Sequence, residues 1–143
     1  VLFRSEEFVR TELHIHVVRD PNYAIRAGAR LAWTASGTST LELGLLGVPQ
    51  IVVYRGNWFN WMIARRLVRV PYVSLVNLIL NRPAVPEYLQ GALTPGALVA
   101  ATRRRLSSSA ARRQARRDAR ELHRCLGSKR ATRLVAQAIL DDL

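Results

Sequence analysis

A short turn between two apolar segments carries the residues best suited to bind a ligand. Ser36, Gly37 and Thr38 follow the apolar run 29–35, and leucines at helical spacing come after them. Glycine lets a ligand approach the backbone with no Cβ in the way, and the first N–H groups of a helix have no partner inside it. The pattern therefore predicts an anion site, suited to phosphate oxygens, at the start of a helix.

An acidic residue adds a second possible ligand contact. Glu42 is the only acid of this predicted helix and lies about one turn inside it. A carboxylate there can accept hydrogen bonds from the two hydroxyls of a ribose, so the turn and the acid together favour a nucleotide. The alternative is structural: Ser36 and Thr38 cap the helix, and Glu42 interacts favourably with its dipole.

The elements around the turn explain its place in a fold. Residues 29–35 and 50–54 are predicted to be buried strands, joined by the helix that ends before Gly47 and Pro49. Two parallel strands with a crossover helix form the unit of an open α/β sheet, which binds ligands at the carboxyl ends of its strands. The fold class is therefore α/β, with the turn at the binding edge.

The middle of the chain holds a further strand prediction and a polar residue at its end. A short helix is expected at 23–28, an aromatic helix running into arginines at 58–67, and a strand at 70–75. Asn77 then lies in a predicted loop, where its amide can meet a ligand. The alternative is ordinary turn chemistry.

The C-terminal part is predicted to be helical. Thr94 and Pro95 give a cap and first position for a helix reaching about residue 106. A very basic helix follows at about 109–125, and an amphipathic one at about 128–142.

Composition is typical of one domain of ordinary size. The chain has 143 residues, of which 49% are hydrophobic, and no run of eighteen apolar residues. Its single cysteine, Cys125, excludes an internal disulfide. Residues 1–5 match what a common sequencing adapter encodes, so they are expected to be an artefact and the domain is assigned to 6–143.

The net charge of +12 is concentrated near the C-terminus. Twelve of the 22 basic residues lie between 102 and 133, together with only two acids. Such a block favours an anionic membrane surface or nucleic acid as partner, while a solvated basic face is the simpler interpretation. Residues 89–143 contain no Phe, Trp or Tyr to stack on bases, so a nucleic-acid partner is not expected.

Six ordered blocks resemble the C-terminal half of lipid-A-disaccharide synthase. They are Ala-Ser-Gly-Thr-Ser-Thr-Leu-Glu at 35–42, Leu-Gly-Val-Pro at 46–49, Val-Tyr-Arg at 53–55, Ile-Ala-Arg-Arg-Leu-Val at 63–68, Pro-Tyr-Val-Ser-Leu-Val-Asn at 71–77, and Val-Pro-Glu-Tyr-Leu-Gln at 85–90. The resemblance implies the Rossmann-like C-terminal domain of a two-domain glycosyltransferase of the B type, the half that binds the UDP-sugar donor, with C-terminal helices from about residue 94.

The resemblance also implies a reaction and the residues that take part. The family transfers 2,3-diacylglucosamine from UDP-2,3-diacylglucosamine to 2,3-diacylglucosamine 1-phosphate, with inversion and release of UDP, in lipid A biosynthesis. The turn at 36–38 would hold the diphosphate, Glu42 the ribose, and Asn77 the family's asparagine position near it. Four further residues match positions lining the same cleft, with less definite roles: Tyr54, Arg55, Glu87 and Gln90.

Other expectations follow from the same likeness. The general base belongs to the family's N-terminal domain, so these 143 residues alone are expected to be inactive. No cofactor and no metal are expected, because fixed dipoles can stabilise the departing UDP. Because both substrates are acylated, the enzyme is expected in the cytoplasm, peripheral at an anionic inner-membrane surface.

Two departures leave room for other functions. Val76 stands where the family usually has proline, and Asn81-Arg82-Pro83 is not its typical loop. A divergent transferase acting on another lipid-linked sugar is therefore an alternative. A basic nucleic-acid-binding module is the alternative from a different class, and an epimerase of the same fold would need catalytic acids that this half lacks.

Overall fold

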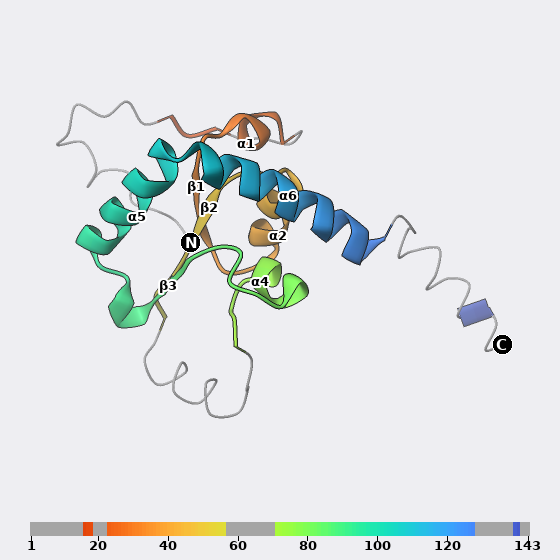
Figure 1. Cartoon of the computed structure of the whole chain (residues 1–143). Helices are drawn as coiled ribbons and strands as arrows, with labels where there is room; N and C mark the ends of the chain where they lie inside the picture. The colour runs from red at the N-terminus through yellow and green to blue at the C-terminus, as the bar shows by residue number, and fades with distance from the viewer. Residues whose placement is uncertain (1–15, 19–22, 57–70, 128–138, 141–143) are drawn as a thin grey trace.

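Three parallel strands form the centre of the protein. The computed structural model describes residues 16–18, 23–56, 71–127 and 139–140. The strands are β1 (Ala32–Ala35), β2 (Gln50–Tyr54) and β3 (Glu87–Leu89), in the order β1-β2-β3 (Figure 1). The register pairs Ala35 with Val53 and Tyr54 with Leu89, so the three strands end at one common edge. The predicted α/β class with a parallel sheet is confirmed.

The predicted strand, turn, helix and strand around the glycine turn are present. Helix α2 (Thr38–Leu45) connects β1 to β2. It ends where Gly47 adopts a φ of 68°, a conformation that favours glycine, and Val48 N–H donates to the carbonyl of Leu43 at 3.0 Å. Pro49 then leads directly into β2, as the sequence indicated.

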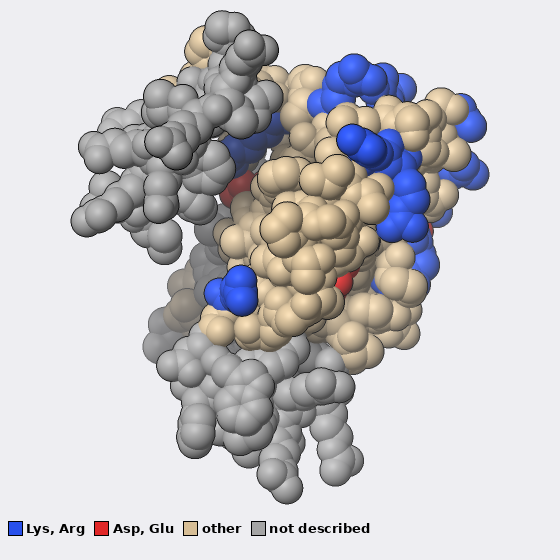
Figure 2. All heavy atoms as spheres, turned by 90° about the vertical axis from the view of Figure 1, so that its left-hand side faces the viewer, with Lys and Arg blue, Asp and Glu red and all other residues tan. Residues whose placement is uncertain are grey.

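Two longer helices complete the C-terminal part and carry most of the positive charge. Helix α5 (Pro95–Ser107) begins at a Thr94 cap, and α6 (Ser109–Leu126) begins at Ser108 and ends before Gly127. Both agree with the predicted helices. Figure 2 shows lysine and arginine side chains gathered on the upper and right-hand parts of the face on which α5 lies. The predicted helices at 58–67 and 128–142 fall wholly or mainly outside the described residues.

The helices cover both faces of the sheet. Helices α2, α4 (Leu75–Leu80) and α6 contact one another on one face. Thr34 Oγ1 lies 2.9 Å from Ser39 Oγ of α2, whereas the neighbouring Trp33 donates from Nε1 to Thr102 Oγ1 of α5 at 3.0 Å. Because successive side chains of a strand point to opposite faces, α5 lies across the sheet from α2. The short helix α1 (Ala24–Gly28) agrees with the one predicted at 23–28.

One part of the sequence prediction is wrong. Residues 71–74 form bends instead of a strand, and Asn77 lies inside helix α4 instead of a loop. Ser74 caps α4 by accepting a hydrogen bond from Asn77 N–H at 3.3 Å. The third strand is instead Glu87–Leu89, followed by the 3-10 turn η2 (Gln90–Ala92). The β-branched residues of 70–76 favoured a strand, but the cap and the apolar run after it favour the helix.

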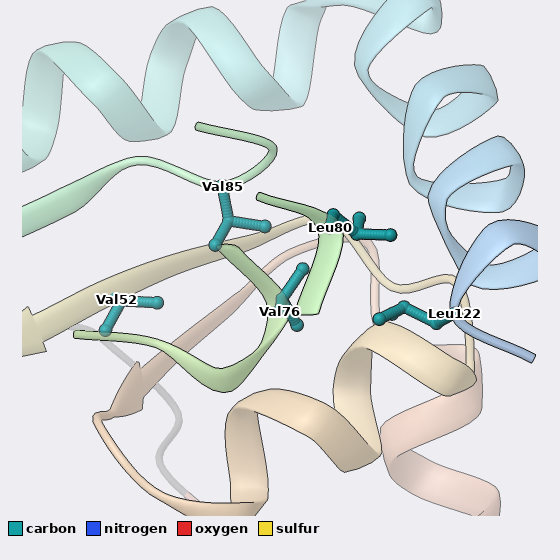
Figure 3. Close-up of a cluster of buried hydrophobic side chains, with 5 residues drawn as sticks. All are labelled: Val52, Val76, Leu80, Val85 and Leu122. Atoms are coloured by element: carbon teal, nitrogen blue, oxygen red, sulfur yellow. The ribbon is translucent and has the colours of Figure 1, made fainter. Parts of the chain in front are cut away.

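The core lies between β2, α4 and α6. Figure 3 shows Val52, Val76, Leu80, Val85 and Leu122 pointing toward one another, and all five are buried. Helix α2 approaches this cluster closely at Gly44, where an added Cβ would lie 2.7 Å from Val76 Cγ2. The glycine therefore allows close packing of α2 on α4. Within the part of the chain that the structure describes, no helix is both long and apolar enough to cross a bilayer.

Candidate functional site

The turn predicted to bind an anion lies at the carboxyl end of β1. Gly37 has φ 152° and ψ −164°, a backbone conformation open to glycine almost alone, and no other group lies within 4 Å of where its Cβ would be. The N–H groups of Thr38 and Ser39 begin helix α2 and have no acceptor among the described residues. The turn thus presents open backbone and unpaired donors, the features an anion requires.

The hydroxyls of the turn do not cap the helix. Gly37 holds the N-cap position, and Ser36 Oγ donates 2.8 Å away to the carbonyl of Val73. Thr40 Oγ1 donates to the carbonyl of Gly37 at 2.7 Å. The alternative that Ser36 and Thr38 serve as helix caps is therefore wrong. Ser36 instead fixes the turn to the segment before α4.

Glu42 faces helix α1. Its Oε2 accepts from Arg26 Nη1 at 2.8 Å, and its Oε1 accepts from the Tyr23 hydroxyl at 3.3 Å. The Arg26 guanidinium also lies over the Tyr23 ring, 4.9 Å from its centroid. The Glu42 side chain remains 34% exposed. Because Glu42 is four residues after the exposed Thr38, both lie on one face of α2.

A second carboxylate near the turn is held by protein donors. Glu87 Oε1 accepts from the Ser74 N–H at 2.9 Å, from the Ser74 hydroxyl at 2.8 Å and from Asn77 Nδ2 at 2.8 Å. Its Oε2 accepts from the Val73 N–H at 3.0 Å. Glu87 therefore ties the beginning of β3 to the beginning of α4. We call Ser74, Asn77 and Glu87 the α4 brace.

The amide of Asn77 is fully used inside the protein. Asn77 is 1% exposed; its Oδ1 accepts from the Val85 N–H at 2.9 Å, and its Nδ2 donates to the Val85 carbonyl at 2.8 Å as well as to Glu87. Both amide hydrogens are thus engaged. In this geometry Asn77 positions neighbouring backbone, and its side chain does not project into open space.

Val73 connects the brace to the turn. Its N–H donates to Glu87 and its carbonyl accepts from Ser36. Ser36, Asn77 and Glu87 are therefore brought together, while Glu42 lies apart against α1. Sequence reasoning missed Val73, Ser74, Tyr23 and Arg26. Only Ser74 carried a sequence signal, as a capping residue before an apolar run.

The remaining candidates lie at the same edge of the sheet. Tyr54 ends β2 and Arg55 follows it, both exposed, and Gln90 follows β3 with a φ of 50°. Gln90 Nε2 is buried and has no hydrogen-bond partner among the described residues. The hollows found in the described part are lined by residues other than Ser36, Gly37, Thr38 and Glu42, so the turn forms an open edge. No group of three metal-ligating side chains occurs within the described ranges.

Comparison with known proteins gives one consistent result. Residues 3–140 match the family described as lipid-A-disaccharide synthetase. Lipid-A-disaccharide synthase of Anaeromyxobacter dehalogenans is 37% identical over 90% of this chain and 33% of its own length. The enzyme of Rhodospirillum centenum is 40% identical over 83% of the chain and 30% of its own length. The enzyme of Granulibacter bethesdensis is 55% identical over 52% of the chain and 19% of its own length.

The extent of these matches decides what they establish. The family match covers nearly the whole chain, whereas the chain spans about a third or less of the curated relatives it matches. The likeness in sequence agrees with the parallel α/β fold and with the glycine turn at the end of β1. The chain therefore belongs to the lipid-A-disaccharide synthetase family.

Proposed function

We propose that this chain is the donor-binding part of an inverting glycosyltransferase. In this proposal the turn Ser36–Thr38 binds the diphosphate of a UDP-linked sugar, and Glu42 binds the ribose. The full-length enzyme transfers 2,3-diacylglucosamine from UDP to 2,3-diacylglucosamine 1-phosphate. The observation that carries the proposal is the pair of unpaired N–H groups behind Gly37, because two parallel donors at a helix start suit a diphosphate.

The position of Glu42 supports the ribose assignment. Its carboxylate lies on the same face of α2 as Thr38 and keeps about a third of its surface exposed, 34%. A ribose hydroxyl is a suitable replacement for the Tyr23 hydroxyl, whose hydrogen bond to Glu42 Oε1 is long at 3.3 Å. Arg26 is able to remain on the other oxygen during this exchange.

The α4 brace acts indirectly in this proposal. Because Ser36 is bonded to Val73, and Val73 to Glu87, the brace fixes the direction in which the turn presents its N–H groups. Preorganised donors stabilise the charge on departing UDP more than mobile ones do. Glu87 and Asn77 are therefore positioning residues. The open edge around the turn suits a site that a second domain completes.

The test is UDP binding by the full-length enzyme, with two glycine variants. Gly37→Ala places a side chain where φ is 152°, so we expect UDP affinity to fall at least about tenfold. Gly96→Ala is the control, because Gly96 is also exposed with open space around it but needs no positive φ. Calorimetric titration measures both. Equal UDP affinity in the two variants, or no UDP binding by the parent enzyme, contradicts the proposal.

The enzyme is also proposed to work in the cytoplasm at an anionic membrane surface. Both proposed substrates carry acyl chains, and the nine arginines of α5 and α6 give the protein a strongly basic side. Such attraction is electrostatic, so we expect binding to anionic vesicles to weaken as ionic strength rises.

A further inference from the structure

A second cationic region lies at the opposite edge of the sheet from the glycine turn. A hollow of about 390 Å³ lies where α5 passes into α6, lined in part by Arg30 before β1 and by Pro49 before β2. Figure 1 shows the α5–α6 junction at the upper edge of the sheet, near the starts of these strands. The glycine turn follows the end of β1, so the two regions are separated by the length of the sheet.

Arginines dominate the lining of this hollow. Its lining contains no acid, and its polar part consists of the serines at 107–109 and of five arginines: Arg30, Arg105, Arg112, Arg113 and Arg116. A neighbouring hollow of about 170 Å³ shares Arg30, Arg112 and Arg116. We call these five residues the arginine cluster. Five guanidinium groups around one space create a strongly positive potential.

The charge of the cluster is not neutralised by nearby carboxylates. The two acids of α6, Asp118 and Glu121, both accept hydrogen bonds from Arg82. Those bonds and charges outweigh the desolvation of Arg82 and raise its pKa. Among the described residues no ion pair joins a carboxylate to any arginine of the cluster.

Arg105 shows the cost of this arrangement most clearly. It is half-buried, lines the hollow, and burial lowers the pKa of its guanidinium despite the charge of Asp118. A buried charge without a paired partner is unfavourable, and an anion in the hollow would offset that cost. Arg113 is already oriented, since its Nη1 donates to Ser109 Oγ at 3.1 Å.

We propose that the arginine cluster binds a phosphate group at the α5–α6 junction. Guanidinium groups bind phosphate in paired hydrogen bonds, and the serine hydroxyls and the first N–H groups of α6 add neutral donors. The phosphate comes either from the head group of an anionic phospholipid or from a soluble phosphate compound. This site is independent of the proposed UDP site and does not rest on it.

The test compares two double variants of the full-length enzyme that lose equal charge. Arg112→Gln with Arg116→Gln removes two members of the cluster and keeps the Cγ of Arg116, which packs against Gly47. Arg103→Gln with Arg120→Gln is the control, because both are exposed, form no side-chain hydrogen bond and line none of the described hollows. Thermal unfolding midpoints verify that both variants fold.

Two binding measurements distinguish the phosphate sources. One is co-sedimentation with phosphatidylcholine vesicles containing phosphatidylglycerol, and the other is calorimetric titration with inorganic pyrophosphate. We expect the cluster variant to bind at least about tenfold more weakly, and the control to change less than about twofold. Binding of pyrophosphate at the glycine turn would be the same in both variants, so it does not affect their difference.

Each outcome has a definite meaning. Loss with vesicles alone assigns the site to a lipid head group, loss with pyrophosphate alone assigns it to a soluble compound, and loss with both assigns it to phosphate in general. Equal weakening in the two variants, or no binding by the parent enzyme, overturns the proposal in favour of diffuse charge. Tighter binding of duplex DNA than of either probe overturns it in favour of nucleic acid.

Discussion

Two glutamates on either side of the glycine turn have opposite environments. Glu87 accepts four hydrogen bonds, two of them from backbone N–H groups of Val73 and Ser74. Glu42 accepts from two side chains, Arg26 and Tyr23, and its side chain is 34% exposed. One carboxylate is held by fixed donors, whereas the other is held by groups that can move. The comparison teaches that residue type alone does not distinguish a positioning acid from a ligand-binding one.

The difference follows from what each acid would leave behind. Removal of Glu87 leaves N–H groups at the start of α4 without an acceptor, and such unpaired groups are costly when buried. Removal of Glu42 leaves Arg26 and Tyr23, which are near enough to the surface to be hydrated. Stability should therefore depend on Glu87, and ligand affinity should depend on Glu42.

The largest expected effect is that of Glu87→Ala on stability. Loss of four hydrogen bonds to a carboxylate should lower the free energy of unfolding by at least about 3 kcal/mol. Urea titration measures this change. Glu121→Ala is the matched control, because it removes a carboxylate that is 41% exposed and accepts from Arg82 alone, and it should cost less than about 1 kcal/mol. Similar costs for the two variants would show that Glu87 is not a brace.

An intermediate effect is expected where the brace meets the turn. Ser36→Ala removes one hydrogen bond, to the Val73 carbonyl, and should cost about 1 kcal/mol of stability. The turn then loses its fixed direction, so UDP affinity should fall several-fold in the same variant. Thr38→Ala is the comparison, since Thr38 is exposed and its hydroxyl forms no hydrogen bond with described residues. A larger affinity loss for Thr38→Ala would mean that hydroxyl contact, and not orientation by Ser36, controls binding.

The sequence was sufficient for elements defined by local signals. Strands β1 and β2, helix α2 and helices α5 and α6 were all predicted, because apolar periodicity, serine and threonine caps and stopping glycines are contained in short stretches. Helix α4 and strand β3 were missed. Their ends are fixed by contacts between Glu87 and residues 13 and 14 positions earlier, and no local pattern reports such a contact.

The site residues show a similar limit. Ser36, Asn77 and Glu87 were selected by resemblance, and the structure brings them together. Their link is the backbone of Val73, and backbone groups are the same for every residue, so sequence cannot identify it. Arg26 was missed because its contact with Glu42 spans 16 positions and because basic residues occur throughout this chain.

The smallest stability effect belongs to the pair that should matter most for the ligand. Glu42→Ala and Arg26→Gln break the same ion pair from opposite sides, and because both side chains are a third or more exposed, each should cost less than about 1 kcal/mol. Their UDP affinities should differ, since only Glu42→Ala removes the ribose acceptor. We expect about a tenfold weaker UDP affinity for Glu42→Ala and little change for Arg26→Gln, measured by calorimetry on the full-length enzyme. Equal losses in both variants would show that the ion pair, and not the carboxylate, supports binding, and Glu42 would then join Glu87 as a positioning residue.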